Sequence, residues 1–211
     1  MALEEAGLAF DAHLINIMSG DQFTSGFSEI NPNQKIPALV DLDGPGGSRV
    51  NVFESGAILL YIAEKTGTLI PKDPVKRVDC LNWLFWLQGS APYFGQFGHF
   101  FKYAAPKWSD GYAVERYTME TKRLLDVLNN KLKGKNFICG DEYTIADIAI
   151  YPWVMCLDKF YNARELLGLD DYKHVCAWLD RVDARPSTKL GMRINNFNND
   201  EYSNYTSKGS Q

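Results

Sequence analysis

The chain has 211 residues, 45% of them hydrophobic and 13% aromatic, which is enough to bury a sizeable core. Its 26 acidic residues outnumber the 22 basic ones, and this balance argues against a general nucleic-acid binder. No uncharged run is long enough to span a bilayer, and no secretory signal follows Met1. We therefore expect a cytoplasmic protein that binds neither nucleic acid nor a membrane.

The cysteines show no CxxC spacing, and no two of the three histidines lie close enough in sequence to suggest a metal pair. This pattern predicts reduced, inert thiols and no metal site, rather than a disulfide framework or a zinc centre. The four cysteines are Cys80, Cys139, Cys156 and Cys176.

The first region, 1–70, mixes short strands with helix. Gly and Pro residues in 43–48 predict a hairpin loop between two of the strands. Ser55 is a candidate N-cap for a helix that stops at Gly67. Alternating or continuous apolar residues predict the strands at 10–17, 36–41 and 49–53.

The second region, 74–192, is predicted to be helical throughout, and a polar tail, 193–211, follows it. Thr144 and Asp147 form a capping-box pattern directly before an apolar run, which should be the buried centre of this domain. Apolar spacing predicts its helices from Pro74 to about Gly89, from Tyr112 to Leu132, from Ile145 to about Met155 and from about Tyr172 to Ala184.

Two features of the first region suggest a binding site for an extended peptide. The Ile36–Pro37 bond opens a strand and is a candidate cis peptide, which would turn the Ile36 N–H and carbonyl out of the sheet. Glu54 and Ser55 lie at a helix start, where free amides favour a carboxylate and Glu54 can accept from an ammonium. Taken singly, each feature has a plainer interpretation, with Pro37 as a strand start and Ser55 as an N-cap.

Together, and in this order along the chain, these features resemble the glutathione transferase superfamily, and more narrowly its nu-class glutathione-dependent disulfide-bond reductases. The resemblance covers about residues 1–190. It implies an α/β thioredoxin-like N-terminal domain followed by an all-α C-terminal domain. The motifs that carry it are Gly20–Phe23, Asn31–Asn33, Asn82–Trp86, Phe97–Phe100 and Glu115–Tyr117.

The resemblance also implies a glutathione-binding site in the first domain. Ile36–Pro37 would present backbone groups to the cysteinyl part of the tripeptide. Glu54 and Ser55 would hold the γ-glutamyl end, and Gln22 and Lys35 would lie near the glycyl end.

Two residues of the second domain are added by the resemblance, Gln88 and Arg116. Without it, Arg116 would be interpreted as a surface cation or as the partner of Glu120 one helical turn away. For Gln88, a polar position near a helix end is an equally good interpretation. His99, among aromatic residues, is assigned to packing, and Asp147 to the capping box.

The chain departs from the family at its start. In the nu class a strand and an activating Thr-Pro-Asn-Gly turn precede the first helix, whereas here Met1–Gly7 matches the end of that helix. No catalytic residue is therefore assigned, and we expect this sequence to be an incomplete version of a longer protein; a short form with a disrupted first domain is the alternative. A missing central strand would leave a gap of about 10 Å between 10–17 and 36–40, with unpaired backbone on both sides.

The resemblance implies a glutathione-dependent enzyme, either a transferase or a disulfide reductase, in which the thiol of bound glutathione is the nucleophile. Glutathione would serve as substrate or co-substrate, together with a small electrophile or a disulfide and without a metal. A homodimer is implied as well. The competing hypothesis is a non-catalytic binding or regulatory protein that keeps the fold and has lost the activating turn.

Overall fold

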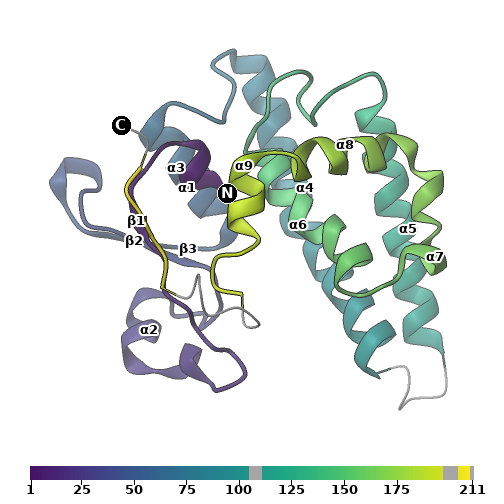
Figure 1. The fold of residues 1–211 in the computed structure, drawn as a ribbon, viewed down its shortest axis with the longest axis horizontal. Helices are drawn as coiled ribbons and strands as arrows, with labels where there is room; N and C mark the ends of the chain where they lie inside the picture. The colour runs from purple at the N-terminus through teal and green to yellow at the C-terminus, as the bar shows by residue number, and fades with distance from the viewer. Residues whose placement is uncertain (105–110, 197–203, 210–211) are drawn as a thin grey trace. The chain divides into compact units, whose positions relative to one another are not determined.

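The computed structural model describes residues 1–104, 111–196 and 204–209. The chain forms two compact units, and we describe each by itself. The first unit comprises residues 1–68 together with 186–211, and the second comprises residues 69–185 (Figure 1).

The first unit contains two small antiparallel sheets and short helices. β2 pairs with β3, and β1 pairs with β4 from the C-terminal part of the chain. Its elements are α1 (Ala2–Glu5), β1 (Phe10–Asp11), η1 (Asp21–Phe23), α2 (Ser25–Ile30), β2 (Ala38–Asp41), η2 (Pro45–Gly47), β3 (Val50–Phe53), α3 (Ser55–Thr66), α9 (Pro186–Gly191) and β4 (Thr206–Ser207).

The β2–β3 hairpin confirms the two predicted strands and the loop between them. Ala38 lies opposite Phe53 and Asp41 opposite Val50 in its register. At the loop, a Cβ on Gly44 would come within 2.7 Å of a backbone oxygen, so this close approach requires glycine. The helix α3 follows directly and ends, as predicted, at Gly67 in the left-handed conformation. Its buried face packs toward the hairpin and consists of Ile58, Leu59, Ile62 and Ala63.

The strand predicted over 10–17 is wrong in length, because only Phe10–Asp11 pairs. Its partner is Thr206–Ser207, and the pairing continues with a 2.7 Å hydrogen bond from the Ala12 N–H to the Tyr205 carbonyl. One edge of β1 is thus paired with a segment far along the sequence, which runs beside it in Figure 1, while no strand of the described residues joins β1 to β2.

The second unit is helical. Asp73 caps its first long helix by accepting the Lys76 N–H at 2.9 Å, and Pro74 occupies the first helical position. None of the described helices is both long and apolar enough to cross a membrane. The elements are α4 (Pro74–Gly98), a π-helical segment (His99–Ala104), α5 (Tyr112–Leu132), α6 (Ile145–Lys159), α7 (Arg164–Leu167), η4 (Leu169–Asp171) and α8 (Lys173–Asp183).

α4 continues well beyond the predicted end at Gly89, even though Pro92 lies inside it. Ser90, Phe94 and Phe97 are buried in the added turns, and α4 packs along both α5 and α6. This packing outweighs the local preference of glycine and proline to end a helix.

α6 is the buried centre of the unit, as predicted, and its capping box is present. The Asp147 carboxylate is fully buried and accepts the Thr144 N–H at 3.0 Å. The same carboxylate accepts the Ile138 N–H and the Trp178 indole N–H, each at 2.9 Å. Asp147 thus joins the start of α6 to α8, and its assignment to structure rather than catalysis agrees with these contacts.

Candidate functional site

The predicted peptide-binding residues of the first unit gather at one end of the β2–β3 hairpin. Ile36–Pro37 directly precedes Ala38, and Glu54 directly follows Phe53, its cross-strand partner. Both segments therefore leave the sheet at the same edge. The Asn33 amide strengthens this association by donating to Glu54 Oε1 at 3.3 Å.

The Ile36–Pro37 peptide bond is cis, which confirms that prediction. Ile36 lies outside β2 and is 48% exposed. Within the described part of the chain, neither its N–H nor its carbonyl forms a hydrogen bond. An extended ligand can therefore pair with both groups without displacing a strand.

Glu54 and Ser55 form the start of α3, one residue earlier than predicted. The N-cap is Glu54, and Ser55 is the first helical residue, so the N-cap interpretation of Ser55 is wrong. The Glu54 carbonyl accepts the first helical bond from the Ile58 N–H at 2.9 Å. The amides that precede Ile58, and the Ser55 hydroxyl, are left as donors at the positive end of the helix dipole, an arrangement that favours a carboxylate.

The backbone of Glu54 has an unusual conformation for a side chain of its size. Its φ of 70° and ψ of 124° lie in a region that non-glycine residues rarely adopt. Strain of this kind costs on the order of 1–3 kcal/mol and concentrates at functional sites. The sequence gives no signal for it, nor for the contact between Asn33 and Glu54.

Gln22 and Lys35 lie in the same unit, but no hydrogen bond among the described residues joins them to Ile36, Glu54 or Ser55. Gln22 is on η1 and donates to the Ile17 carbonyl at 3.4 Å, while its own Oε1 is buried without a partner. Lys35 is exposed.

The two residues of the second unit differ in their surroundings. Gln88 lies on α4, and its amide nitrogen is buried without a described partner. Arg116 is exposed on α5. Glu120, the alternative partner of Arg116 one turn away, instead accepts hydrogen bonds from Arg123 at 2.6 and 2.9 Å. These bonds are the main reason that the pKa of Glu120 is lowered.

Arg116 lines an aromatic cavity of about 280 Å³ in the second unit. Phe100 stacks on Tyr117 with ring centroids 5.4 Å apart, and Tyr93 lies 6.4 Å from the same ring. A cavity with aromatic walls and one cation suits a ligand that has an apolar body and an anionic group. The remaining lining residues are Tyr112 and Ala113.

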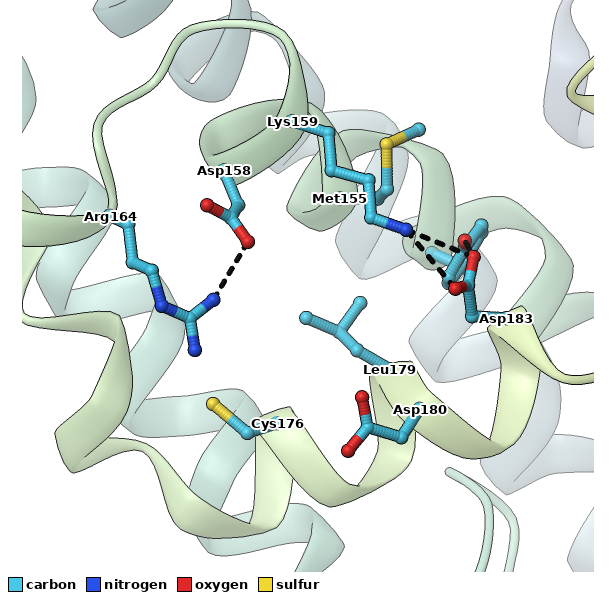
Figure 2. A pocket seen from close by; sticks show the side chains of 9 residues that line it. Met155, Asp158, Lys159, Arg164, Cys176, Leu179, Asp180 and Asp183 are labelled. Atoms are coloured by element: carbon cyan, nitrogen blue, oxygen red, sulfur yellow. Dashed lines mark hydrogen bonds and ion pairs between the residues drawn. The ribbon is translucent and has the colours of Figure 1, made fainter.

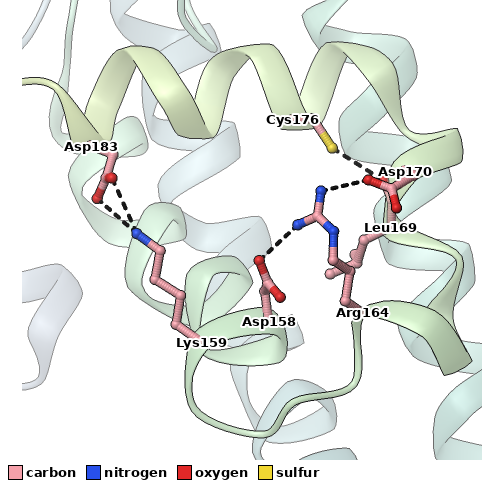
Figure 3. Close-up of polar contacts among 7 residues, drawn as sticks. All are labelled: Asp158, Lys159, Arg164, Leu169, Asp170, Cys176 and Asp183. Carbon is pink, nitrogen blue, oxygen red and sulfur yellow. Dashed lines mark hydrogen bonds and ion pairs between the residues drawn. The ribbon is translucent and has the colours of Figure 1, made fainter.

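A smaller cavity, of about 110 Å³, lies between α6 and α8 (Figure 2). Most of its charged side chains already bind one another: Arg164 contacts Asp158 at 2.7 Å, and Lys159 contacts Asp183 at 3.1 Å. The Cys176 thiol donates to the Leu169 carbonyl at 3.2 Å (Figure 3). Because these groups are paired, we interpret this cavity as part of the packing between helices rather than as a substrate site.

No group of three or more metal-ligating side chains occurs in residues 1–104, 111–196 and 204–209.

Comparison with known proteins identifies the family. The chain matches the models "Glutathione S-transferase, N-terminal domain" over residues 1–65 and "Glutathione S-transferase, C-terminal domain" over residues 80–186. It is 52% identical to the disulfide-bond oxidoreductase YghU of Escherichia coli over 201 residues, which are 94% of this chain and 68% of that protein. It is 44% identical to the disulfide-bond oxidoreductase YfcG of the same organism, over 88% of this chain and 84% of that protein.

Solved structures of glutathione transferases are also similar to this chain. A glutathione transferase from Pseudomonas putida, with one glutathione disulfide bound per subunit, matches with a TM-score of 0.90 and 44% identity, over 92% of this chain and 85% of that one. A glutathione transferase from Burkholderia graminis, with two glutathione molecules bound per subunit, matches with a TM-score of 0.88 and 45% identity, over 90% and 80% of the two chains. The chain has the glutathione transferase fold and belongs to the glutathione transferase family.

Proposed function

We propose that this protein is a glutathione-dependent disulfide-bond reductase in which the thiol of bound glutathione is the nucleophile. The observation that carries the proposal is the shared edge of the β2–β3 hairpin, where the free backbone of Ile36 and the start of α3 meet. Two relatives named disulfide-bond oxidoreductases, and two neighbours with glutathione or its disulfide bound, support the same substrate class.

Each part of the tripeptide has a proposed partner in residues 1–70. The N–H and carbonyl of Ile36 pair with the cysteinyl residue beside Pro37. The Ser55 hydroxyl and the first amides of α3 bind the γ-glutamyl carboxylate, and Glu54 accepts from the neighbouring ammonium. Gln22 and Lys35 are assigned to the glycyl end on the family resemblance.

The helical domain, 74–192, contributes Gln88 and Arg116 in this proposal. The Gln88 amide nitrogen is buried without a partner among the described residues, and Gln88 is assigned to the site on the family resemblance. Arg116, the cation among the described residues that line the aromatic cavity, would bind an anionic group. We assign no role in catalysis to the polar tail, 193–211.

The reaction proceeds by two thiol–disulfide exchanges. The glutathione thiolate attacks one sulfur of the substrate disulfide, which breaks the S–S bond, forms a mixed disulfide and releases the first product thiol after protonation. A second glutathione thiolate attacks the glutathione sulfur of the mixed disulfide and releases the second thiol. The substrate disulfide is thus reduced, and two glutathiones are oxidised to glutathione disulfide. A free thiol is mostly protonated at neutral pH, so lowering the pKa of the bound sulfur is the main catalytic task.

Calorimetry and turnover test the proposal. We expect glutathione to bind the purified chain, and Ser55→Ala to weaken that binding roughly 10-fold or more, because a hydrogen bond to a charged group contributes about 1.5–3 kcal/mol. Ser48→Ala, an exposed serine in the hairpin loop, is the matched control and should bind like the wild type. The absence of heat on titration with glutathione, or equal affinities for Ser55→Ala and Ser48→Ala, would contradict the site.

Turnover separates an enzyme from a binding protein. The mixed disulfide of glutathione and hydroxyethyl thiol is the test substrate, with consumption of glutathione as the readout. Reduction by the wild type that falls in Ser55→Ala supports the reductase. Binding of glutathione without turnover would instead identify a non-catalytic member of the family. The homodimer is also proposed on the family resemblance, and sedimentation of the purified chain checks it. The cytoplasmic location is proposed from the amino-acid sequence.

A further inference from the structure

At its C-terminal end, α4 passes into the π-helical segment His99–Ala104, whose turn is wider than that of an α-helix. Turns of this kind are rare and are found frequently at functional sites. Two successive rings of the segment have different partners. The Phe101 ring stacks on the buried Phe97 ring, with centroids 5.5 Å apart. The Phe100 ring stacks instead on Tyr117 of α5, at 5.4 Å, so the segment holds one ring in the core and directs the next to another helix.

The Phe100 ring is part of the wall of the aromatic cavity that Arg116 lines. Phe100 and Tyr117 both line this cavity, and their ring planes are nearly parallel, with 9° between them. His99 meets the Phe100 ring edge-on at 5.4 Å. The placement of the π-helical segment therefore decides where this part of the wall stands.

Lys102 fastens the segment to the end of α6. Its ammonium donates a hydrogen bond to the Phe160 carbonyl at 2.5 Å and lies 4.2 Å from the centre of the Phe160 ring. The Tyr103 ring is 5.7 Å from the same ammonium. Phe160 is the C-cap of α6, where the helix dipole favours a cation. The two rings are 50% and 49% exposed, so they bury little apolar surface, and the charge of Lys102 supplies the attachment.

We propose that Lys102 is a positioning residue for the aromatic cavity. By binding the end of α6, it holds Phe100 in the cavity wall and so supports ligands that combine an aromatic body with an anionic group. This inference rests on the ligand role proposed for Arg116. Lys102 itself is not among the described residues that line the cavity, so it acts through the ring. The competing interpretation is a helix cap that stabilises α6 and has no effect on a ligand.

Calorimetric titration of the full chain with naphthalenesulfonate tests the inference. This probe has an aromatic body and one anionic group, and its binding requires no turnover. Arg116→Gln should weaken its binding, which places the probe in the cavity. Lys102→Met should weaken it roughly 3- to 10-fold, while Lys102→Arg keeps the charge and should bind like the wild type. Lys159→Met is the matched control, because it removes a cation from the last turn of the same helix whose partner is Asp183, and it should leave the affinity unchanged.

A double-mutant cycle separates positioning from a general loss of stability. Phe100→Leu removes the ring directly and should weaken binding at least as much as Lys102→Met. The double variant Lys102→Met/Phe100→Leu should bind no more weakly than Phe100→Leu alone, because a residue that acts through the ring has no effect once the ring is gone. Where Lys102→Met does not fold, Phe160→Leu tests the same attachment, since it removes a half-exposed ring and keeps the carbonyl. It should weaken binding in the same direction, and an unchanged affinity would count against the inference.

Several outcomes would overturn the inference. One is that Lys102→Met lowers the Tm and leaves the affinity unchanged, and another is that Lys159→Met weakens binding equally. Losses in Lys102→Met and Phe100→Leu that simply add would do the same. So would a wild type that does not bind the probe, or an Arg116→Gln variant that binds it fully, because the cavity would then not be the site. Reduction of the mixed disulfide of glutathione and hydroxyethyl thiol is measured separately. That substrate has no aromatic ring, so intact turnover beside a failed probe result refutes this inference and not the proposed function.

Discussion

Replacing Asp147 by alanine tests what holds the start of α6 in place. The carboxylate is fully buried and accepts four hydrogen bonds. Oδ1 accepts from the Ile138 N–H and the Trp178 indole, both at 2.9 Å. Oδ2 accepts from the Thr144 N–H at 3.0 Å and from its hydroxyl at 3.1 Å. Asp147→Ala removes every one of these acceptor interactions at once.

The expected loss of stability follows from the donors left behind. The Thr144 hydroxyl can rotate toward another acceptor, but the two backbone N–H groups and the Trp178 indole cannot. Each of these three buried donors without a partner costs about 1–3 kcal/mol, so we expect Asp147→Ala to lose about 3–9 kcal/mol. Asp147→Asn keeps one acceptor oxygen and should lose roughly half as much. Trp178→Phe removes a single donor and keeps most of the ring packing, so it should lose about 1–2 kcal/mol.

Urea unfolding followed by far-ultraviolet circular dichroism measures these losses, because this signal reports the helices and does not depend on the removed indole. We expect Asp147→Ala to be the least stable variant, followed by Asp147→Asn and then Trp178→Phe. The reasoning is refuted if Asp147→Ala is as stable as Trp178→Phe, since the carboxylate would then be no more than the partner of one indole.

Two other predictions each concern one contact, the first in the first unit and the second in the second unit. The Lys65 ammonium holds the pKa of Asp41 down at about 2, so the stabilisation is present above about pH 4 and is lost as the pH falls toward 2. Because the pair is partly exposed, Asp41→Asn should cost only about 1 kcal/mol at pH 7 and almost nothing near pH 2, measured by urea unfolding at both pH values. A Cβ on Gly98 would lie 2.0 Å from the Tyr161 ring, so Gly98→Ala should lower the Tm by an amount that reflects about 2 kcal/mol or more. Gly89→Ala, in the same helix with open space around it, should leave the Tm unchanged or raise it, and a similar fall for both variants would contradict the steric explanation.

The features that were predictable from sequence are those specified within a few residues. The bounds of α5, Tyr112–Leu132, match the apolar stripe, because spacing along one helix face is a local signal. The Thr144–Asp147 capping box and the stop at Gly67 are also local, since each depends on a few neighbouring backbone groups. The cis bond at Ile36–Pro37 belongs to the same class.

The features that sequence reasoning missed depend on contacts between distant segments. α4 continues through Gly89 and Pro92 because Phe94 and Phe97 are buried beyond them. Local helix propensities do not include the stabilisation that this burial provides. The left-handed backbone of Glu54 is likewise set by the junction between β3 and α3 rather than by the glutamate itself. Of the candidate site, the residue types and their place at a strand and a helix start were predictable, but the contact between Asn33 and Glu54 was not.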